Sequence, residues 1–102
     1  MSALPPERVD STTIRQIFNN CQELKTLVIE KKNKTLLKSK KLSNPEKKGL
    51  PNGTYSESFS YRNENGSYSV IVHQYTLPDG QIGASGQPDP KRVQIKGKIY
   101  FV

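Results

Sequence analysis

Apolar side chains near the start of the chain repeat with the period of a helix. They recur at spacings of three and four residues, and Arg, Asn, Gln and Glu fill the positions between them. The apolar set is Ile14, Ile17, Phe18, Cys21, Leu24 and Val28. Because an α-helix has 3.6 residues per turn, these side chains share one face. We predict a helix over residues 11–25, capped by Asp10 or Ser11, with Cys21 as a small core residue.

Residues 26–42 fit two descriptions. In the first, residues 26–29 leave the helix as a strand, 33–34 turn, and 35–37 return as a second strand. In the second, the helix continues to residue 32 and a second short helix covers 34–42. Short apolar runs of this kind do not separate strand from helix. Of the two descriptions, we favour the helical one.

From residue 54 the period changes to two. Tyr55, Glu57, Phe59 and Tyr61 alternate with small hydroxyl residues, which is typical of a strand with two different faces. The pair Asn65-Gly66 then predicts a tight hairpin, since both residues tolerate positive φ. We expect the next strand, about 67–77, to pair antiparallel with the first. On it Tyr68, Val70, Val72 and Gln74 face one way, and Ile71, His73, Tyr75 and Leu77 face the other.

Glycine and proline punctuate the last third of the chain. Residues 78–80, Pro-Asp-Gly, predict a turn, and residues 81–84 a brief edge strand. Pro88 and Pro90 argue against a central strand between residues 87 and 91. Residues 93–95 and 99–101 flank Lys96-Gly97 and predict a closing hairpin.

Together these elements predict an α+β fold in which one or two N-terminal helices pack on an antiparallel sheet of about four strands. At 102 residues we expect a single domain over 1–102. Residues 1–10 are expected to be a loose lead-in, 31–53 a lysine-rich connection, and 54–102 the sheet.

The charge of the chain favours a polyanionic partner. Sixteen Lys and Arg against nine Asp and Glu give a net charge of +7. Nucleic acid ranks ahead of an acidic protein or a membrane surface. Half of the cations lie close together: Lys31, Lys32, Lys34, Lys38, Lys40, Lys41, Lys47 and Lys48. Such a run is either a solvated surface or a surface that follows phosphates and adds affinity without sequence information.

Several classes of site are not expected. With one Cys, Cys21, the chain has no internal disulfide, in agreement with a reducing, cytoplasmic location. One His and one Cys do not make a zinc motif, and the spacing of Gly80, Gly83 and Gly86 is not that of a dinucleotide site. We therefore expect no metal and no cofactor. We also expect no membrane segment, because no apolar run approaches 18 residues.

The remaining candidates are His73, Tyr75, Ser85, Lys91 and Arg92, in and beyond the second strand and its glycine-rich loop. Metal-independent RNA cleavage needs a group that accepts the 2′-hydroxyl proton, a donor for the leaving oxygen, and cations for the phosphorane. Histidine suits the first two tasks, Lys or Arg the third, and Tyr can orient or donate. His73 and Tyr75 are two residues apart on a strand and so share a face.

The segment from His73 to Gly80, continued from Ala84 to Arg92, resembles small bacterial toxin nucleases of the barnase–EndoU–colicin–RelE-like group, as do the order of elements and the basic charge. The resemblance implies metal-independent RNA cleavage, with His73 and Arg92 in the acid–base and phosphate roles and Tyr75 and Lys91 assisting. It also implies a neutralising antitoxin or immunity protein. Some members use two histidines and this chain has one, so the second proton-transfer group stays open. The alternative is a non-catalytic basic module that binds nucleic acid or an acidic partner protein.

Overall fold

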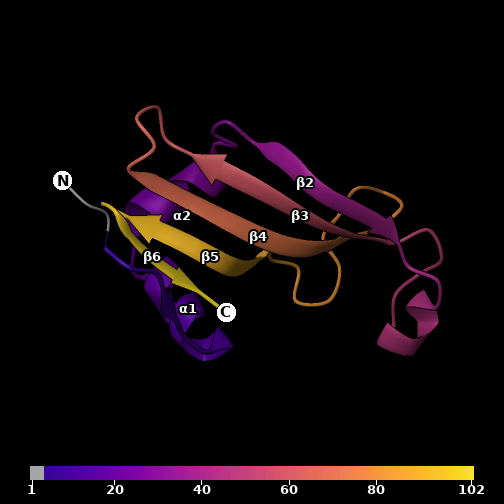
Figure 1. The fold of residues 1–102 in the computed structure, drawn as a ribbon. Coiled ribbons are helices and arrows are strands. Elements are labelled where there is room, and N and C mark those ends of the chain that lie inside the picture. The colour runs from indigo at the N-terminus through magenta and orange to yellow at the C-terminus, as the bar shows by residue number, and fades with distance from the viewer. Residues whose placement is uncertain (1–3) are drawn as a thin grey trace.

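The computed structural model describes residues 4–102, and residues 1–3 of the expected lead-in lie outside this range. Along the chain, β1 comes first, two α-helices follow it, and the other five strands come after the helices (Figure 1). The elements are β1 (Glu7–Arg8), α1 (Ser11–Asn19), α2 (Gln22–Ile29), β2 (Thr35–Lys41), the 3₁₀ helix η1 (Pro45–Lys48), β3 (Tyr55–Arg62), β4 (Tyr68–Thr76), β5 (Asp89–Ile95) and β6 (Lys98–Phe101). The α+β class is confirmed.

The sheet is larger than predicted and is not purely antiparallel. Within residues 4–102 it has six strands in the order β1-β6-β5-β4-β3-β2, rather than about four. Consecutive strands from β2 to β6 pair antiparallel, but β1 pairs parallel to β6, so the sheet is mixed. Residues 7–8 of the expected loose lead-in therefore belong to the sheet edge. Two residues are too short to show a strand period in the sequence, and only their partner strand defines them.

The predicted helix over 11–25 is two helices. Asp10 caps α1 as expected, and its Oδ1 accepts a 2.7 Å hydrogen bond from the Thr13 N–H. The helical geometry stops at Asn20, and Cys21 is extended, with φ −112° and ψ 101°. The apolar spacing continues across this break, so periodicity alone did not reveal it. Asn is a weak helix former, and the break lets each helix turn its own apolar residues toward the sheet.

Neither description of residues 26–42 is right as a whole. Residues 26–29 are helical, in agreement with the favoured description, and lie in α2. The second helix over 34–42 is wrong, because residues 35–41 form β2 and pair with β3. Lysine and leucine favour helix locally, but backbone pairing to a neighbouring strand overrides that preference. The lysine-rich segment 31–53 therefore contains β2, all of whose residues are exposed, and η1.

The central hairpin follows the predicted alternation. β3 and β4 pair in an unbroken register from Tyr55 opposite Thr76 to Arg62 opposite Ser69. Gly66 in the connecting turn has a φ of +76°, the conformation that glycine adopts without strain. The predicted edge strand over 81–84 is reduced to an isolated bridge between Ile82 and Thr76.

The exclusion of a central strand near Pro88 and Pro90 is wrong. Pro90 lies in β5, opposite Val72 of β4, and β5 runs between β4 and β6. The position of Pro90 within β5 explains why a proline is tolerated there. β6 pairs only with residues 92–95, so Pro90 has a strand partner on one side only.

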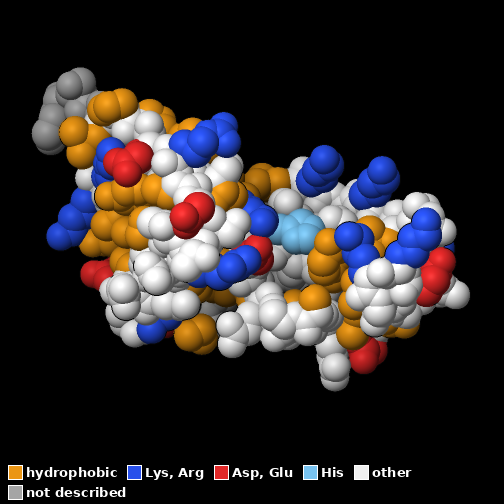
Figure 2. Space-filling model, turned by 90° about the horizontal axis from the view of Figure 1, so that it is seen from below, with side chains coloured by type: hydrophobic (Ala, Val, Ile, Leu, Met, Phe, Trp, Pro, Cys, Tyr) orange, Lys and Arg blue, Asp and Glu red, His pale blue; other side chains and the backbone are white. Residues whose placement is uncertain are grey.

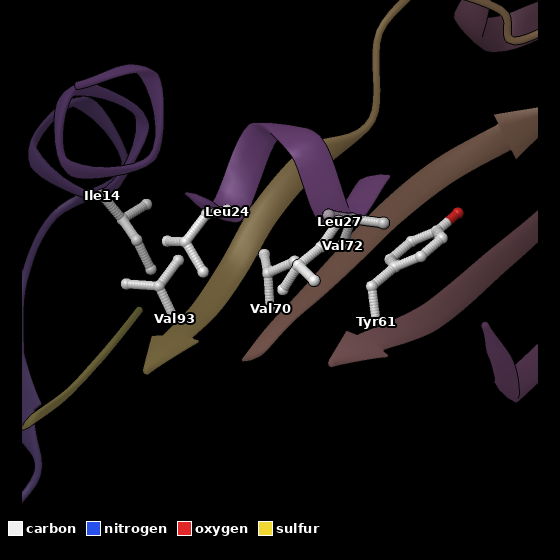
Figure 3. Close-up of a cluster of buried hydrophobic side chains, with 7 residues drawn as sticks. All are labelled: Ile14, Leu24, Leu27, Tyr61, Val70, Val72 and Val93. Atoms are coloured by element: carbon white, nitrogen blue, oxygen red, sulfur yellow. The ribbon is translucent and has the colours of Figure 1, made fainter. Parts of the chain in front are cut away.

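The hydrophobic core lies between the two helices and one face of the sheet (Figure 3). The helices contribute Ile14, Leu24 and Leu27, and the strands contribute Tyr61, Val70, Val72 and Val93. These side chains are at most 5% exposed. Figure 1 shows α2 passing behind the strands, so this covered face of the sheet is turned away from the viewer. Among the described residues, no helix is long and apolar enough to cross a membrane.

Two residues of α2 test this packing. Leu24 is fully buried against the sheet, whereas Ile29 is 75% exposed. We expect Leu24→Ala to lower the free energy of unfolding by about 2–5 kcal/mol, because it leaves a cavity in the core. The matched control, Ile29→Ala, is expected to change it by less than about 0.5 kcal/mol. Chemical denaturation followed by circular dichroism measures both, and equal effects of the two substitutions would contradict the packing.

Candidate functional site

The face of the sheet opposite the core, here called the open face, carries most of the polar chemistry. Directly paired residues on neighbouring strands share a face, and successive residues alternate. Since Val70 and Val72 of β4 are in the core, Ile71, His73 and Tyr75 point to the open face. The register then adds their partners to it: Ser60, Ser58 and Ser56 from β3, Lys38 and Lys40 from β2, and Arg92 from β5.

His73 is half-buried and held by two neighbours. Its Nε2 shares a 2.7 Å hydrogen bond with Ser56 Oγ on the adjacent strand. The ring of Tyr75 meets the imidazole edge-on, with ring centroids 4.9 Å apart. A side chain with a hydrogen-bond partner on one side and an aromatic ring on another has few rotamers left. The imidazole is therefore held in one orientation.

A hollow of about 520 Å³ lies beside this ring, and we call it the His73 hollow. Figure 2 shows the pale blue histidine at the surface, with blue and red charged side chains close by. The residues lining the hollow are Arg15, His73, Gln74, Tyr75, Gly83, Ala84, Ser85, Gln87, Asp89 and Lys91. They come from α1, β4, the loop after β4, and β5. Segments far apart in the sequence thus meet around one imidazole.

The loop after β4 is fixed to the strand from which it leaves. The Gly83 N–H donates to the Tyr75 carbonyl at 2.8 Å, and the Leu77 N–H donates to the Gln81 carbonyl at 2.8 Å. Gly83 is buried, and a Cβ there would lie 2.8 Å from Leu77 and 2.9 Å from Leu50. The absence of a side chain lets the loop lie this close, and it places Ser85 at the rim of the hollow.

Asp89 joins the helix to the sheet at the wall of the hollow. One carboxylate oxygen accepts a 3.0 Å hydrogen bond from Arg15 Nε on α1, and the other lies 2.9 Å from Lys91 Nζ. The strand bulges at this point, because Ile71 pairs with Arg92 while Val72 pairs with Pro90. A bulge inserts one extra residue and redirects its side chain. Here the extra residue is Lys91, which comes to lie on the hollow.

These charges set the protonation of the two titrating groups. Burial lowers the pKa of His73 below 6.5, and the positive charges of Lys91 and Lys48 lower it further, against an opposing effect of Asp89. Partial burial raises the pKa of Asp89, but the hydrogen bonds from Arg15 and Lys91 outweigh it and hold the pKa below its usual 3.8. At neutral pH the imidazole is therefore uncharged and the carboxylate ionised.

The structure brings four of the five candidate residues together. His73, Tyr75, Ser85 and Lys91 all line the hollow. Arg92 does not line it. It is exposed on the open face, opposite Ile71. Of the two adjacent cations, Lys91 alone therefore lines the hollow, because the bulge separates the two side chains.

Sequence reasoning missed three members of the site. They are Arg15, one of the polar residues between the apolar positions of the predicted helix, Asp89, to which no role was given, and Ser56, one of several hydroxyl residues that alternate along the predicted strand. Nothing local marks Arg15 or Ser56, whose partners lie 74 and 17 residues away. For Asp89 the sequence did contain a signal, since this residue lies two positions before the candidate Lys91.

The eight candidate phosphate-binding lysines do not form one surface. Lys38 and Lys40 point to the open face, whereas Lys41 points to the other face with its partner Tyr55. Lys34 covers Phe59 and Tyr61, with Nζ 4.3 Å from the Phe59 ring centre.

The other four candidate lysines lie outside β2. Lys48 lies over Tyr75 with Nζ 5.8 Å from the ring centre, and Lys32 lies 3.9 Å from Glu30. Lys31 and Lys47 are exposed in the turn after α2 and in η1. Of the eight, Lys38, Lys40 and Lys48 are therefore the ones near the open face.

Comparison of the chain with protein-family models, with curated proteins and with solved structures finds no match. The assignment of a role therefore depends on the geometry and charge of the site itself. Within residues 4–102, no three His, Cys, Asp or Glu side chains gather into a group that could hold a metal ion.

The charges around His73 can be tested one at a time. His73 is the only histidine, so its proton resonances titrate alone in an NMR spectrum. We expect Asp89→Asn to lower the pKa of His73, because it removes the negative charge that favours the imidazolium. Lys91→Gln is expected to raise it, because it removes a positive charge. Lys41→Gln, on the other face, serves as the control and is expected to leave it unchanged. The same direction of shift for Asp89→Asn and Lys91→Gln would contradict the arrangement.

Proposed function

We propose that the protein is a metal-independent ribonuclease that cleaves RNA through attack of the 2′-hydroxyl on the adjacent phosphate. One observation carries the proposal: the uncharged, oriented imidazole of His73 shares a single hollow with Lys91, Arg15 and Tyr75. These are the groups that such a reaction needs, and they come from three separate segments, α1, β4 and β5. The resemblance of the segment from His73 to Arg92 to small toxin nucleases points the same way.

His73 is the proposed general base. A base works best when it is unprotonated at the working pH and its pKa is close to that pH, and the lowered pKa of His73 meets the first condition at pH 7. Ser56 fixes the tautomer in this proposal. With Nε2–H donated to Ser56 Oγ, the Nδ1 lone pair is free to accept the 2′-hydroxyl proton. Ser56 is therefore a positioning residue.

Lys91 and Arg15 are the proposed phosphate-binding groups. As the 2′-oxygen attacks, negative charge builds on the phosphorane oxygens, and fixed cations stabilise it most where water is excluded. Asp89 holds both cations against the hollow and sets their positions. Because the carboxylate partly neutralises them, the phosphate has to compete with Asp89. The proposed role of Asp89 is thus to position the two cations, although its negative charge also weakens their attraction for the phosphate.

Tyr75 is the proposed donor to the leaving 5′-oxygen. It shares the open face with His73, its ring centre lies 4.9 Å from that of the imidazole, and Lys48 Nζ lies 5.8 Å from the Tyr75 ring centre. After the transfer the phenolate regains a proton from solvent. This assignment supplies the second proton-transfer group in a chain that has one histidine.

Cleavage of RNA by purified protein in excess chelator tests the proposal. We expect the wild-type protein to cleave a mixed RNA substrate. We expect His73→Ala to lower kcat by about 10²–10⁴-fold, because it removes the general base. Lys41→Gln, which removes a positive charge on the other face, is expected to retain activity. Gel electrophoresis of end-labelled RNA measures the cleavage rates.

Two outcomes would exclude the proposed ribonuclease activity. Equal cleavage by the wild type and His73→Ala would point to a contaminating nuclease, and no cleavage by either would leave the alternative, a non-catalytic module that binds nucleic acid or an acidic protein. A cleavage product that ends in a 2′,3′-cyclic phosphate is expected, because the attacking oxygen belongs to the substrate. A 5′-phosphate product would exclude 2′-hydroxyl attack.

The pH dependence of kcat/KM provides an independent test. Cleavage requires His73 without its proton, so the rate is expected to rise with pH and level off. The midpoint is expected below pH 6.5, because burial and neighbouring cations lower the pKa of the ring. The midpoint has to agree with the pKa measured by NMR for the same residue. A midpoint above 6.5 would assign the acid limb to another group.

A ribonuclease with this site also implies a neutralising partner in the cell that makes it. The hollow is bounded by cations, so the partner we propose is an acidic protein that covers His73.

A further inference from the structure

The cations of the open face lie along a line that crosses the sheet from β2 to β5, and the register of the strands defines this line. Lys38 pairs with Ser58, and Lys40 pairs with Ser56, so both lysines follow β2 on the open face. Ser58 in turn pairs with His73, and Ser56 with Tyr75. Each lysine therefore begins a row that crosses β3 and ends on a residue of the proposed active site.

The same line continues on the far side of β4. His73 pairs with Asp89, and Ile71 pairs with Arg92, which is exposed on the open face. The bulge adds Lys91 between them. Three strand spacings of about 4.8 Å separate β2 from β5, so the two pairs of cations are roughly 14 Å apart in the direction across the sheet. The proposed base lies between them.

We propose that this line is a track for one extended strand of RNA, which runs across β2, β3, β4 and β5 with its scissile phosphate at His73. Lys38 and Lys40 hold phosphates on one side of the cleavage point, and Arg92 holds a phosphate on the other. The inference depends on the proposed ribonuclease function and names its substrate as single-stranded RNA. It also gives Arg92, which lies outside the His73 hollow, a position on the substrate path.

Acidic charge is directed away from the track. The acidic residue of β3, Glu57, points to the other face, where it accepts hydrogen bonds from Ser39 and Thr76 at 2.7 Å each. Asp89, at the end of the line, is already engaged by Arg15 and Lys91. Between the lysines and His73 lie the serine hydroxyls of β3, which can bond to phosphate and sugar oxygens. Cations with hydroxyl groups between them suit a phosphodiester backbone.

The shape of the site favours a single strand over a duplex. The proposed base is half-buried beside a hollow of about 520 Å³, so the reacting nucleotide has to enter the hollow. A nucleotide in a duplex must first unstack and unpair to do so, which is energetically unfavourable. Tyr75 and the imidazole, edge to face on the open side, offer ring surface on which an unpaired base can stack.

Binding of an oligonucleotide that cannot be cleaved separates the track from the chemistry. The probe is a fluorescein-labelled single-stranded DNA of about twelve nucleotides, which has no 2′-hydroxyl and is of a length that a small binding face accommodates. Fluorescence anisotropy gives Kd over a range of salt concentrations. The full chain is used throughout, both as wild type and as Lys38→Gln/Lys40→Gln.

The control variant removes the same charge from elsewhere. Lys25→Gln/Lys41→Gln also deletes two lysines, one on α2 and one on β2 that points away from the open face. We expect Lys38→Gln/Lys40→Gln to weaken binding roughly tenfold at low salt. Its slope of log Kobs against log salt is expected to fall by about 1.4, since each lost contact to a single strand contributes about 0.7. The control is expected to keep the wild-type slope.

Arg92→Gln extends the test to the other end of the line. We expect it to reduce the slope by about 0.7, and the triple variant to show the sum of the two effects. In cleavage assays, Lys38→Gln/Lys40→Gln is expected to raise KM and leave kcat unchanged, because these lysines touch the strand away from the reacting atoms.

Three results would overturn the track: equal slopes for Lys38→Gln/Lys40→Gln and the control, equal or tighter binding of the annealed duplex, or competition by polyglutamate as strong as that by the oligonucleotide. The last would identify the face as a site for acidic proteins. Failure of the proposed function looks different, because the binding results then follow the track while no RNA is cleaved. Conversely, cleavage that depends on His73 but not on Lys38 and Lys40 would support the proposed ribonuclease function and contradict the proposed track.

Discussion

The alternation of side chains along β4 is the constraint on which the rest of the structure depends. Val70 and Val72 are buried under the helices, and this fixes Ile71, His73 and Tyr75 on the opposite face. A slip of one residue in register would exchange the two sets, burying an imidazole and exposing two valines. The hydrophobic effect that selects the fold thus also selects the face on which the polar chemistry lies. The orientation of His73 needs no separate explanation.

Asp89 adds a second connection between stability and the site. It joins α1 to β5 and lies at the wall of the His73 hollow, so the helix position and the cation positions depend on one carboxylate. Both ion pairs are partly exposed, and such pairs contribute little to the free energy of folding. Their value lies in geometry. Two flexible side chains that would otherwise sample many rotamers are directed at the same small volume.

The sequence predicted those parts of the molecule that local patterns encode. The β3–β4 hairpin, its two faces and its turn follow from a period of two and an Asn-Gly pair, and the cap at Asp10 follows from a preference of single residues. His73, Tyr75, Ser85 and Lys91 were predicted as site candidates because they lie close together in the sequence, on one strand, in the loop after it and just beyond that loop. The features that the sequence did not predict depend on partners far away in the chain. β1 exists only because β6 lies beside it, and β2 only because β3 pairs with it. Arg15 belongs to the site because Asp89, far along the chain, comes to it.

The parallel pairing of β1 with β6 has a consequence for biosynthesis. Glu7 lies opposite Tyr100, and the Val9 N–H donates to the Phe101 carbonyl at 2.8 Å, so almost the first residues described bind almost the last. During translation, the early segment has to wait until β6 leaves the ribosome. Contacts between such remote segments form late and slowly, because the intervening chain must be ordered first. The nascent chain thus carries an incomplete sheet edge until β6 has been synthesised, and a chaperone that shields exposed strands would act in that interval.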